Sequence, residues 1–180
     1  DIIEAIMSRK HLEFKGLVSY PGHPYKAKNH IEVEKIALEE LNIMKQLKFL
    51  LEQQGIEVKE LSIGSTPTLL TGIDITGVSE IRPGNYVFLD RTTWHLGLIT
   101  PEQIALNVIA TIVSKNKNYF IIDAGTKILS SDLGPHGSKI LEDYGVAYPI
   151  DSYLDSSREM KIVSLSEEHG FIKRPSFDLP

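Results

Sequence analysis

The long helical pattern between residues 29 and 55 constrains the fold more than any other part of the sequence. Asn29 can cap the start of a helix, and Gly55 can end it. Apolar residues recur between them at three- and four-residue spacing: Val33, Ile36, Ala37, Leu41, Met44, Leu47 and Leu51. We therefore predict an amphipathic helix that packs on a sheet. The charged residues between these positions are assigned to its solvent-exposed face: Glu39, Glu40, Lys45 and Lys48.

Strand patterns flank this helix on both sides. Residues 12–18 precede it, and residues 56–63 follow it with a phase shift between Val58 and Leu61 that a bulge would explain. A strand, a long helix and a second strand form a β-α-β unit, which is typical of a parallel sheet or a (β/α) barrel. In a barrel, the turns that follow both strands lie at the same, catalytic rim.

The pattern changes after about residue 80. Short strand patterns separated by turns follow, at residues 86–89, 108–113, 119–123, 145–150 and 161–165. The predicted fold class is therefore α/β, with two domains. Residues 1–80 are expected to form part of a (β/α) TIM-type barrel, and residues 81–180 a mainly antiparallel β-domain.

Charge and composition exclude several classes of function. The net charge of −5 argues against nucleic acid as a partner, because binding to phosphate backbones needs a basic surface. The absence of cysteine excludes disulfides, thiolate metal sites and a cysteine nucleophile. No apolar run approaches the roughly 20 residues that span a membrane. We expect a cytoplasmic protein without a membrane partner.

Two turns rich in small residues lie close together in the sequence. Residues 64–68 read Gly-Ser-Thr-Pro-Thr, and residues 80–86 contain Arg-Pro-Gly-Asn. Such turns expose backbone N–H groups, and a concave row of these groups binds an anion. The side chains of Ser65, Thr66 and Asn85 would add donors. Two ordinary loops are the alternative, because short glycine motifs are common.

Five strings together resemble the D-threonine aldolase and D-serine dehydratase group of pyridoxal-phosphate enzymes, which have the alanine-racemase-like fold. In chain order they are GLVSYPGH at 16–23, GSTPT at 64–68, EIRPGNYVFLD at 80–90, IIDAGTKILSSD at 121–132 and SEEHG at 166–170. The resemblance implies a cofactor-binding (β/α) barrel joined to a β-domain, usually in a dimer. It also implies that pyridoxal phosphate serves as an electron sink for a D-amino or 3-hydroxy amino acid.

The resemblance assigns roles to residues within these strings. The expected cofactor contacts are Gly64, Ser65, Thr66, Gly84 and Asn85 for the phosphate, Tyr20 for the ring and Arg82 for the pyridine nitrogen. For Arg82, an exposed loop arginine is the alternative. Three histidines are candidates for the substrate side of the site: His23, His136 and His169.

Two parts of the family pattern have no counterpart in these 180 residues. One is the lysine that bonds the cofactor, which the family carries in an N-terminal Arg-Pro-His-x-Lys-Thr string. The other is a divalent-metal site that lies downstream of the SEEHG string. The catalytic residue is therefore unassigned. We expect the chain to be the middle and later portion of such an enzyme, and to be inactive in isolation.

These inferences lead to two hypotheses. In the first, the intact protein is a homo-oligomeric, pyridoxal-phosphate-dependent enzyme that acts on D-amino acids by aldol cleavage, dehydration or racemisation. In the second, the chain is a non-catalytic fragment that serves as an interaction or anion-binding module. Half of a barrel leaves open strand edges, which favour pairing with another chain.

Overall fold

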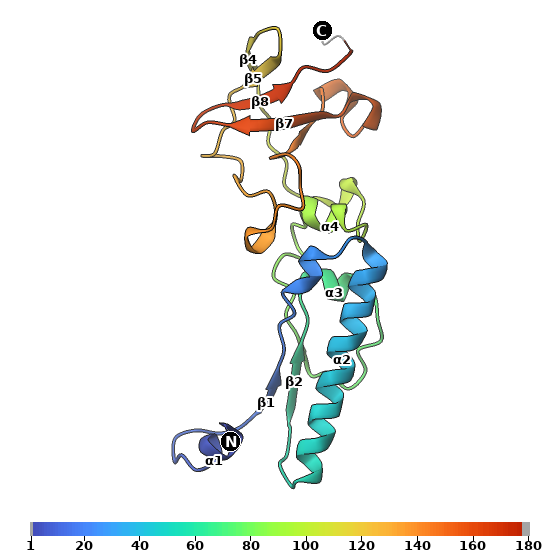
Figure 1. The fold of residues 1–180 in the computed structure, drawn as a ribbon, viewed down its shortest axis with the longest axis vertical. Coiled ribbons are helices and arrows are strands. Elements are labelled where there is room, and N and C mark those ends of the chain that lie inside the picture. The colour runs from blue at the N-terminus through green and yellow to red at the C-terminus, as the bar shows by residue number, and fades with distance from the viewer. Residues whose placement is uncertain (1, 178–180) are drawn as a thin grey trace. The chain divides into compact units, whose positions relative to one another are not determined.

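The computed structural model describes residues 2–177, except the side chain of His136. The chain divides into two compact units, the first ending at Tyr86 and the second beginning at Val87 (Figure 1). Within the described residues, no helix has the length and apolar character needed to cross a bilayer.

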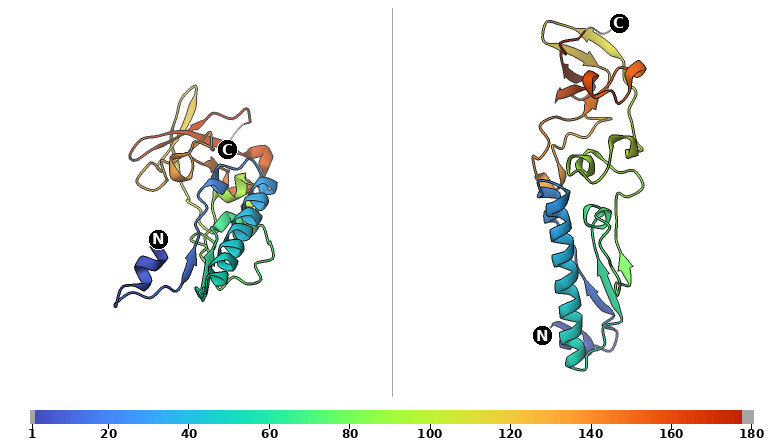
Figure 2. Two further views of the ribbon diagram at one scale, coloured as in Figure 1. Left: turned by 60° about the horizontal axis from the view of Figure 1, so that its bottom comes forward. Right: turned by 90° about the vertical axis from the view of Figure 1, so that its right-hand side faces the viewer.

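A parallel sheet and one long helix form the first unit. β1 (Gly16–Val18), β2 (Glu60–Ile63) and β3 (Glu80–Ile81) pair in that order, and both pairings are parallel. The helix α2 (His30–Gln53) connects β1 to β2 and lies along one face of the sheet (Figure 2). The predicted β-α-β unit is confirmed. The shorter helices of this unit are α1 (Ile2–Met7), η1 (His23–Lys26) and α3 (Thr66–Leu70).

The helix α2 begins at its predicted cap and packs through its apolar stripe. The side chain of Asn29 accepts a hydrogen bond of 3.1 Å from the backbone N–H of Glu32. The core of the unit joins two residues of α2 to two of β2: Leu41, Met44, Leu61 and Ile63. Packing of this apolar face on the sheet therefore holds the crossover in place.

The assignment of Glu40 to the solvent-exposed face of α2 is wrong, because its side chain is buried and only 7% exposed. Glu40 lies three residues after Ala37 and four before Met44, and both of these are buried. The 3.6-residue period of the helix places all three on the packed face. Leu47, which we assigned to the apolar stripe, is instead exposed.

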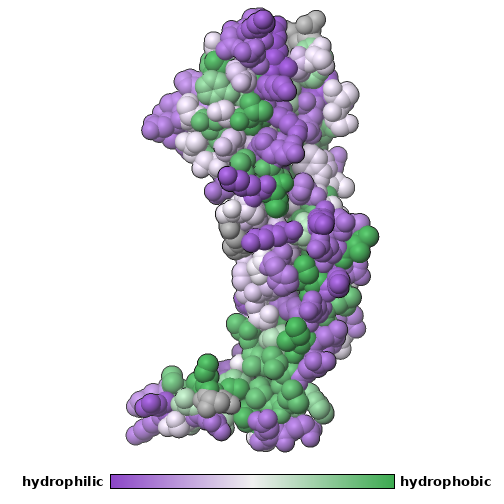
Figure 3. All heavy atoms as spheres, viewed as in Figure 1, coloured by the Kyte–Doolittle hydropathy of each residue, from purple (hydrophilic) through white to green (hydrophobic). Residues whose placement is uncertain are grey.

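Apolar side chains also remain at the surface of the first unit. Figure 3 shows apolar surface on its lower part, near the end of α2 and beside β1. The large apolar residues that are exposed in this unit include Val18, Ile43, Leu47, Phe49 and Leu50. A three-stranded sheet covered on one face by one helix cannot bury both faces of its strands, which parallel sheets normally do.

An antiparallel sheet forms the second unit, as predicted. Its strands are β4 (Ile112–Lys115), β5 (Tyr119–Ile122), β6 (Val146–Ala147), β7 (Met160–Leu165) and β8 (Gly170–Lys173), and they lie in the order β4-β5-β8-β7-β6. Alternate residues supply its core: Phe120, Ile122, Met160, Ile162 and Ile172. The helices of this unit are α4 (Arg91–His95), η2 (Pro101–Gln103), η3 (Pro135–Gly137), η4 (Ile150–Ser152) and η5 (Ser156–Arg158).

One predicted strand is a turn, and three others are shorter than predicted or begin later. Residues 86–89 form a turn and not a strand, and Leu89 there has a positive φ of 55°. Their β-prone side chains are mostly exposed, and strand propensity depends on a sheet surface to pack against. The strand predicted over residues 56–63 begins only at Glu60, so no bulge is needed, and that predicted over 108–113 begins only at Ile112. The strand predicted over 145–150 is limited to β6.

Three polar contacts link the segments around the sheet of the second unit. Asp143 is buried, and its carboxylate lies 2.6 Å from the guanidinium of Arg91 and 3.8 Å from the ammonium of Lys161. The hydroxyl of Tyr148 donates a hydrogen bond of 2.7 Å to Glu159. Burial, and then this bond to a carboxylate, raise the pKa of Tyr148 well above its ordinary value of 10.0.

Removing the α2 cap should destabilise the first unit. Asn29→Ala leaves the N–H of Glu32 without its acceptor, so we expect a loss of about 1 kcal/mol in the free energy of unfolding. Urea unfolding followed by the far-ultraviolet circular dichroism of α2 measures this loss. Asn29→Ser keeps an acceptor and should retain most of the stability. Equal losses in the two variants would contradict the role of the cap.

Alkaline pH should destabilise the second unit through Tyr148. Because its folded pKa is raised, the unfolded chain loses this proton from about pH 10 while the folded chain keeps it. The contribution of Tyr148 to the free energy of unfolding is therefore complete below pH 10, and it falls as the pH rises further. Unfolding followed by the fluorescence of Trp94 measures this trend. Tyr148→Phe should weaken the pH dependence, and an unchanged slope in that variant would exclude Tyr148 as its source.

Candidate functional site

The carboxyl ends of the three parallel strands form one edge of the sheet in the first unit. Because β1, β2 and β3 are adjacent and parallel, the loops that follow them meet at this edge. Every residue expected to contact the cofactor lies in one of these loops: Tyr20 after β1, Gly64, Ser65 and Thr66 after β2, and Arg82, Gly84 and Asn85 after β3. The topology therefore brings the predicted cofactor residues to one edge.

A hydrogen bond joins the two glycine turns. The backbone N–H of Asn85 donates to the hydroxyl of Thr66 at 3.0 Å. Gly64 begins its turn with a positive φ of 95°, a conformation that favours glycine. The turn after β2 is buried throughout, and the N–H of Ser65 donates to the hydroxyl of Thr68 at 2.9 Å. The turn after β3 is thereby fixed beside the start of α3.

The backbone donors of these turns differ in what they bind. The N–H of Gly64 donates to the carboxylate of Glu40 at 3.1 Å, and that of Ser65 is bonded within its own turn. In residues 2–177, the N–H groups of Thr66 and Gly84 have no hydrogen-bond acceptor. The space beside Gly84 is open, because a Cβ added there would have no neighbour within 4 Å. The N–H groups of Thr66 and Gly84 are therefore backbone donors that no protein acceptor occupies.

Arg82 spans the sheet on the face opposite α2. Its Nε donates to the hydroxyl of Ser62 at 2.8 Å, and its Nη2 donates to the carbonyl of Ser19. The carboxylate of Glu80 accepts from Ser62 and lies 3.8 Å from Nε of Arg82. These contacts link the ends of all three strands. The guanidinium is thus held in one orientation beside the loops described above.

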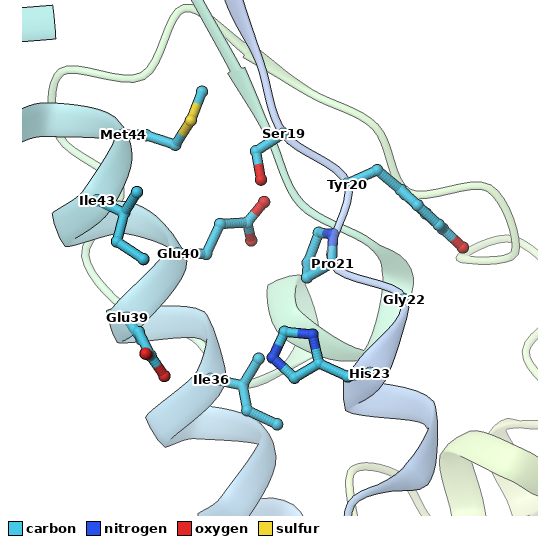
Figure 4. Close-up of a pocket in the computed structure, with 10 residues that line it drawn as sticks. All are labelled: Ser19, Tyr20, Pro21, Gly22, His23, Ile36, Glu39, Glu40, Ile43 and Met44. Atoms are coloured by element: carbon cyan, nitrogen blue, oxygen red, sulfur yellow. The ribbon is translucent and has the colours of Figure 1, made fainter. Parts of the chain in front are cut away.

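A cavity of about 280 Å³ lies on the other face, between α2 and the segment after β1 (Figure 4). Its polar lining includes Ser19, His23, Glu39 and Glu40. Figure 4 shows the carboxylate of Glu40 near the centre and the ring of His23 pointing inward, whereas the ring of Tyr20 points away. His23 and Tyr20, both predicted for one site, therefore face in different directions.

The other two candidate histidines belong to the second unit. His169 lies in the turn between β7 and β8, where its backbone N–H donates to the hydroxyl of Ser166 at 3.2 Å. The side chain of His136 lies outside the described part of the structure. Their roles stay predictions. Nowhere in the described residues do three His, Cys, Asp or Glu side chains converge as metal ligands.

The sequence analysis missed three residues of this region, and each had a detectable signal. Glu40 continues the four- and three-residue spacing of the buried positions on α2. Ser62 alternates with Leu61 and Ile63, so it must point away from α2. Glu80 lies two residues before Arg82 and shares its face of the strand.

Comparison with known proteins shows that the chain is similar to two dehydratases that act on amino acids. Residues 105–179 match the family model of a putative serine dehydratase domain. Over 93% of its length, the chain is 32% identical to D-serine dehydratase from Dictyostelium discoideum. Over 88% of its length, it is 29% identical to D-threo-3-hydroxyaspartate dehydratase from Delftia sp. HT23. The chain spans 44% and 42% of these two relatives.

Solved structures agree in fold over nearly the whole chain. An alanine-racemase-like protein from Idiomarina loihiensis is 31% identical, with a TM-score of 0.79 over 92% of this chain and 44% of that protein. The Delftia dehydratase gives a TM-score of 0.79 at 28% identity, over 91% of this chain and 43% of the dehydratase. D-threonine aldolase from Filomicrobium marinum gives a TM-score of 0.67 over 96% of this chain and 43% of the aldolase. Its sequence identity is 21%, so this likeness concerns the fold alone. The resemblance to the alanine-racemase-like D-serine dehydratase and D-threonine aldolase group, which the sequence motifs indicate, is therefore confirmed.

Proposed function

We propose that this chain is part of a pyridoxal-phosphate-dependent enzyme that dehydrates a D-3-hydroxy amino acid. Both curated relatives are dehydratases, named for D-serine and for D-threo-3-hydroxyaspartate. The chain spans less than half of each relative, so the reaction belongs to the whole protein. Aldol cleavage has less support, because the aldolase neighbour shares only the fold. Racemisation rests on the alanine-racemase-like neighbour alone.

The observation that carries this proposal is the meeting of two glycine turns at the carboxyl edge of the parallel sheet. The hydrogen bond between Asn85 and Thr66 holds these turns together. The unbonded N–H groups of Thr66 and Gly84, with open space beside Gly84, fit the phosphate of pyridoxal phosphate. Ser65 and Asn85 complete the proposed phosphate site from either side.

The other residues would orient the ring. When bound, pyridoxal phosphate supplies an electron sink for the charge that develops on the substrate carbon. Tyr20 follows β1, and its ring points away from the α2 side, so it would pack beside the cofactor ring. Arg82, fixed by Ser62 and Glu80, would direct its remaining donors to the pyridine nitrogen. His23, His136 and His169 stay candidates for the substrate side.

We also infer that the first unit is part of a (β/α) barrel. Its strands pair in sequence order and are all parallel, with α2 on one face and the polar network of Arg82 on the other. Val18 is exposed on the face opposite α2. In a closed barrel this face would be interior, and the outer edges of β1 and β3 would be paired. We extend the proposal to a cytoplasmic homo-oligomer, in keeping with the resemblance.

A cofactor-bonding lysine and a divalent metal complete the proposal for the whole protein. No lysine of this chain is assigned the first role. For the metal, a variant of the Delftia dehydratase has been solved in a metal-free form. The alternative of a non-catalytic module is not favoured, because both curated relatives are enzymes.

Binding of the cofactor to the 180-residue chain tests the phosphate site. We expect calorimetry to show that pyridoxal phosphate binds at least roughly tenfold more tightly than pyridoxal, which lacks the charged group. Thr66→Val should weaken this binding, because it removes the acceptor that holds Asn85. Thr76→Val, in an exposed turn, is the matched control. Equal affinities for the two compounds would contradict the phosphate site.

The two glycines should respond differently to substitution by alanine. Gly84→Ala adds a methyl group in open space, so we expect unchanged stability but weaker binding of pyridoxal phosphate. Gly64→Ala forces a positive φ on alanine and should cost roughly 1–2 kcal/mol of stability. Its Cβ would also contact Leu69 at 3.0 Å. Thermal unfolding and calorimetry measure the two effects. Full cofactor affinity in Gly84→Ala would exclude that turn from the site.

A further inference from the structure

Among the described residues of the first unit, the carboxylate of Glu40 is the one buried acidic group that the proposed site leaves unexplained. Glu40 lies on α2, is 7% exposed, and belongs to the stripe that packs on the sheet. No lysine or arginine in the described part of the chain forms an ion pair with it at 4 Å or less. A buried carboxylate without a cation costs stability, so a hydrophobic residue would suit this position better for folding alone.

The single hydrogen bond of the Glu40 carboxylate within residues 2–177 goes to the proposed phosphate turn. Its Oε1 accepts from the backbone N–H of Gly64 at 3.1 Å, across 24 residues of sequence. The carboxylate also lines the cavity between α2 and the segment after β1. Gly64 is the first residue after β2, and its φ of 95° lies in a region where glycine has great freedom. The bond therefore fixes the direction of the peptide at which the turn begins.

We propose that Glu40 is a positioning residue for the phosphate turn, an inference that rests on the proposed function. By holding the N–H of Gly64 towards α2, it fixes the start of the turn, and the N–H of Thr66 is left without a protein acceptor. The hydrogen bond should thus favour phosphate binding. The negative charge should oppose it, because it lies behind a site for an anion. The charge and the hydrogen bond of Glu40 therefore have opposite effects on the affinity for phosphate, and mutation can separate these effects.

Two substitutions separate these effects. Glu40→Gln removes the charge and keeps an oxygen acceptor for Gly64. Glu40→Met removes both and is close in volume, and it continues the apolar stripe of Ala37 and Met44, so it should fold. We expect Glu40→Gln to bind inorganic phosphate and pyridoxal phosphate more tightly than the unmodified chain. We expect Glu40→Met to bind both roughly tenfold less tightly than Glu40→Gln, because the turn loses its hydrogen bond.

Calorimetry with these two probes and amide hydrogen exchange at Gly64 form the test. Exchange at Gly64 should be faster in Glu40→Met than in Glu40→Gln, at a temperature where both variants are folded. Equal affinities in the two variants, in a chain that binds phosphate, would overturn the positioning role alone. Equal exchange at Gly64 would overturn it as well. An unmodified chain that binds neither probe would overturn the proposed function, and this inference with it.

Discussion

Packing of α2 on β2 is the interaction on which the first unit depends. Leu41 and Met44 meet Leu61 and Ile63, and this contact forces the chain to return parallel to β1. Once the strands are parallel, the loops that follow them must meet at one edge. The two glycine turns are therefore neighbours, although Asn85 lies 19 positions after Thr66. The same helix supplies Glu40 to the first turn.

The two faces of this sheet have different chemistry. On the α2 side, the core contacts are apolar, and the buried Glu40 reaches the peptide of Gly64. On the opposite side, Ser62, Glu80 and Arg82 form a polar network at the carboxyl end of the strands. A ligand that approaches the edge would meet the network and the turns together. The second unit has its own antiparallel core and an ion pair between Arg91 and the buried Asp143.

Prediction from sequence is accurate where the local propensity of a segment agrees with its packing in the fold. The α2 helix was predicted with its cap at Asn29, because a 24-residue amphipathic pattern is a strong local signal. The segment at residues 86–89 was predicted as a strand from its β-prone residues, but it has no sheet to pack on and forms a turn. The short α3 and α4 were missed because the hydroxyls that accept from their N-cap residues also occur in ordinary turns. Thr68 accepts from the N–H of Ser65, and Thr93 accepts from the N–H of Asp90.

The β-α-β unit, the antiparallel second half and the resemblance to D-serine dehydratase can be predicted from sequence, because periodicity and ordered motifs are local properties of the chain. Which donors of the glycine turns lack a protein acceptor, and which face each side chain occupies, follow only from the tertiary structure. The N–H of Gly64 is directed to α2 by a residue 24 positions earlier, and Arg82 is held by groups on two other strand segments. Such contacts depend on which strands are adjacent, and adjacency is fixed only when the helix packs on the sheet.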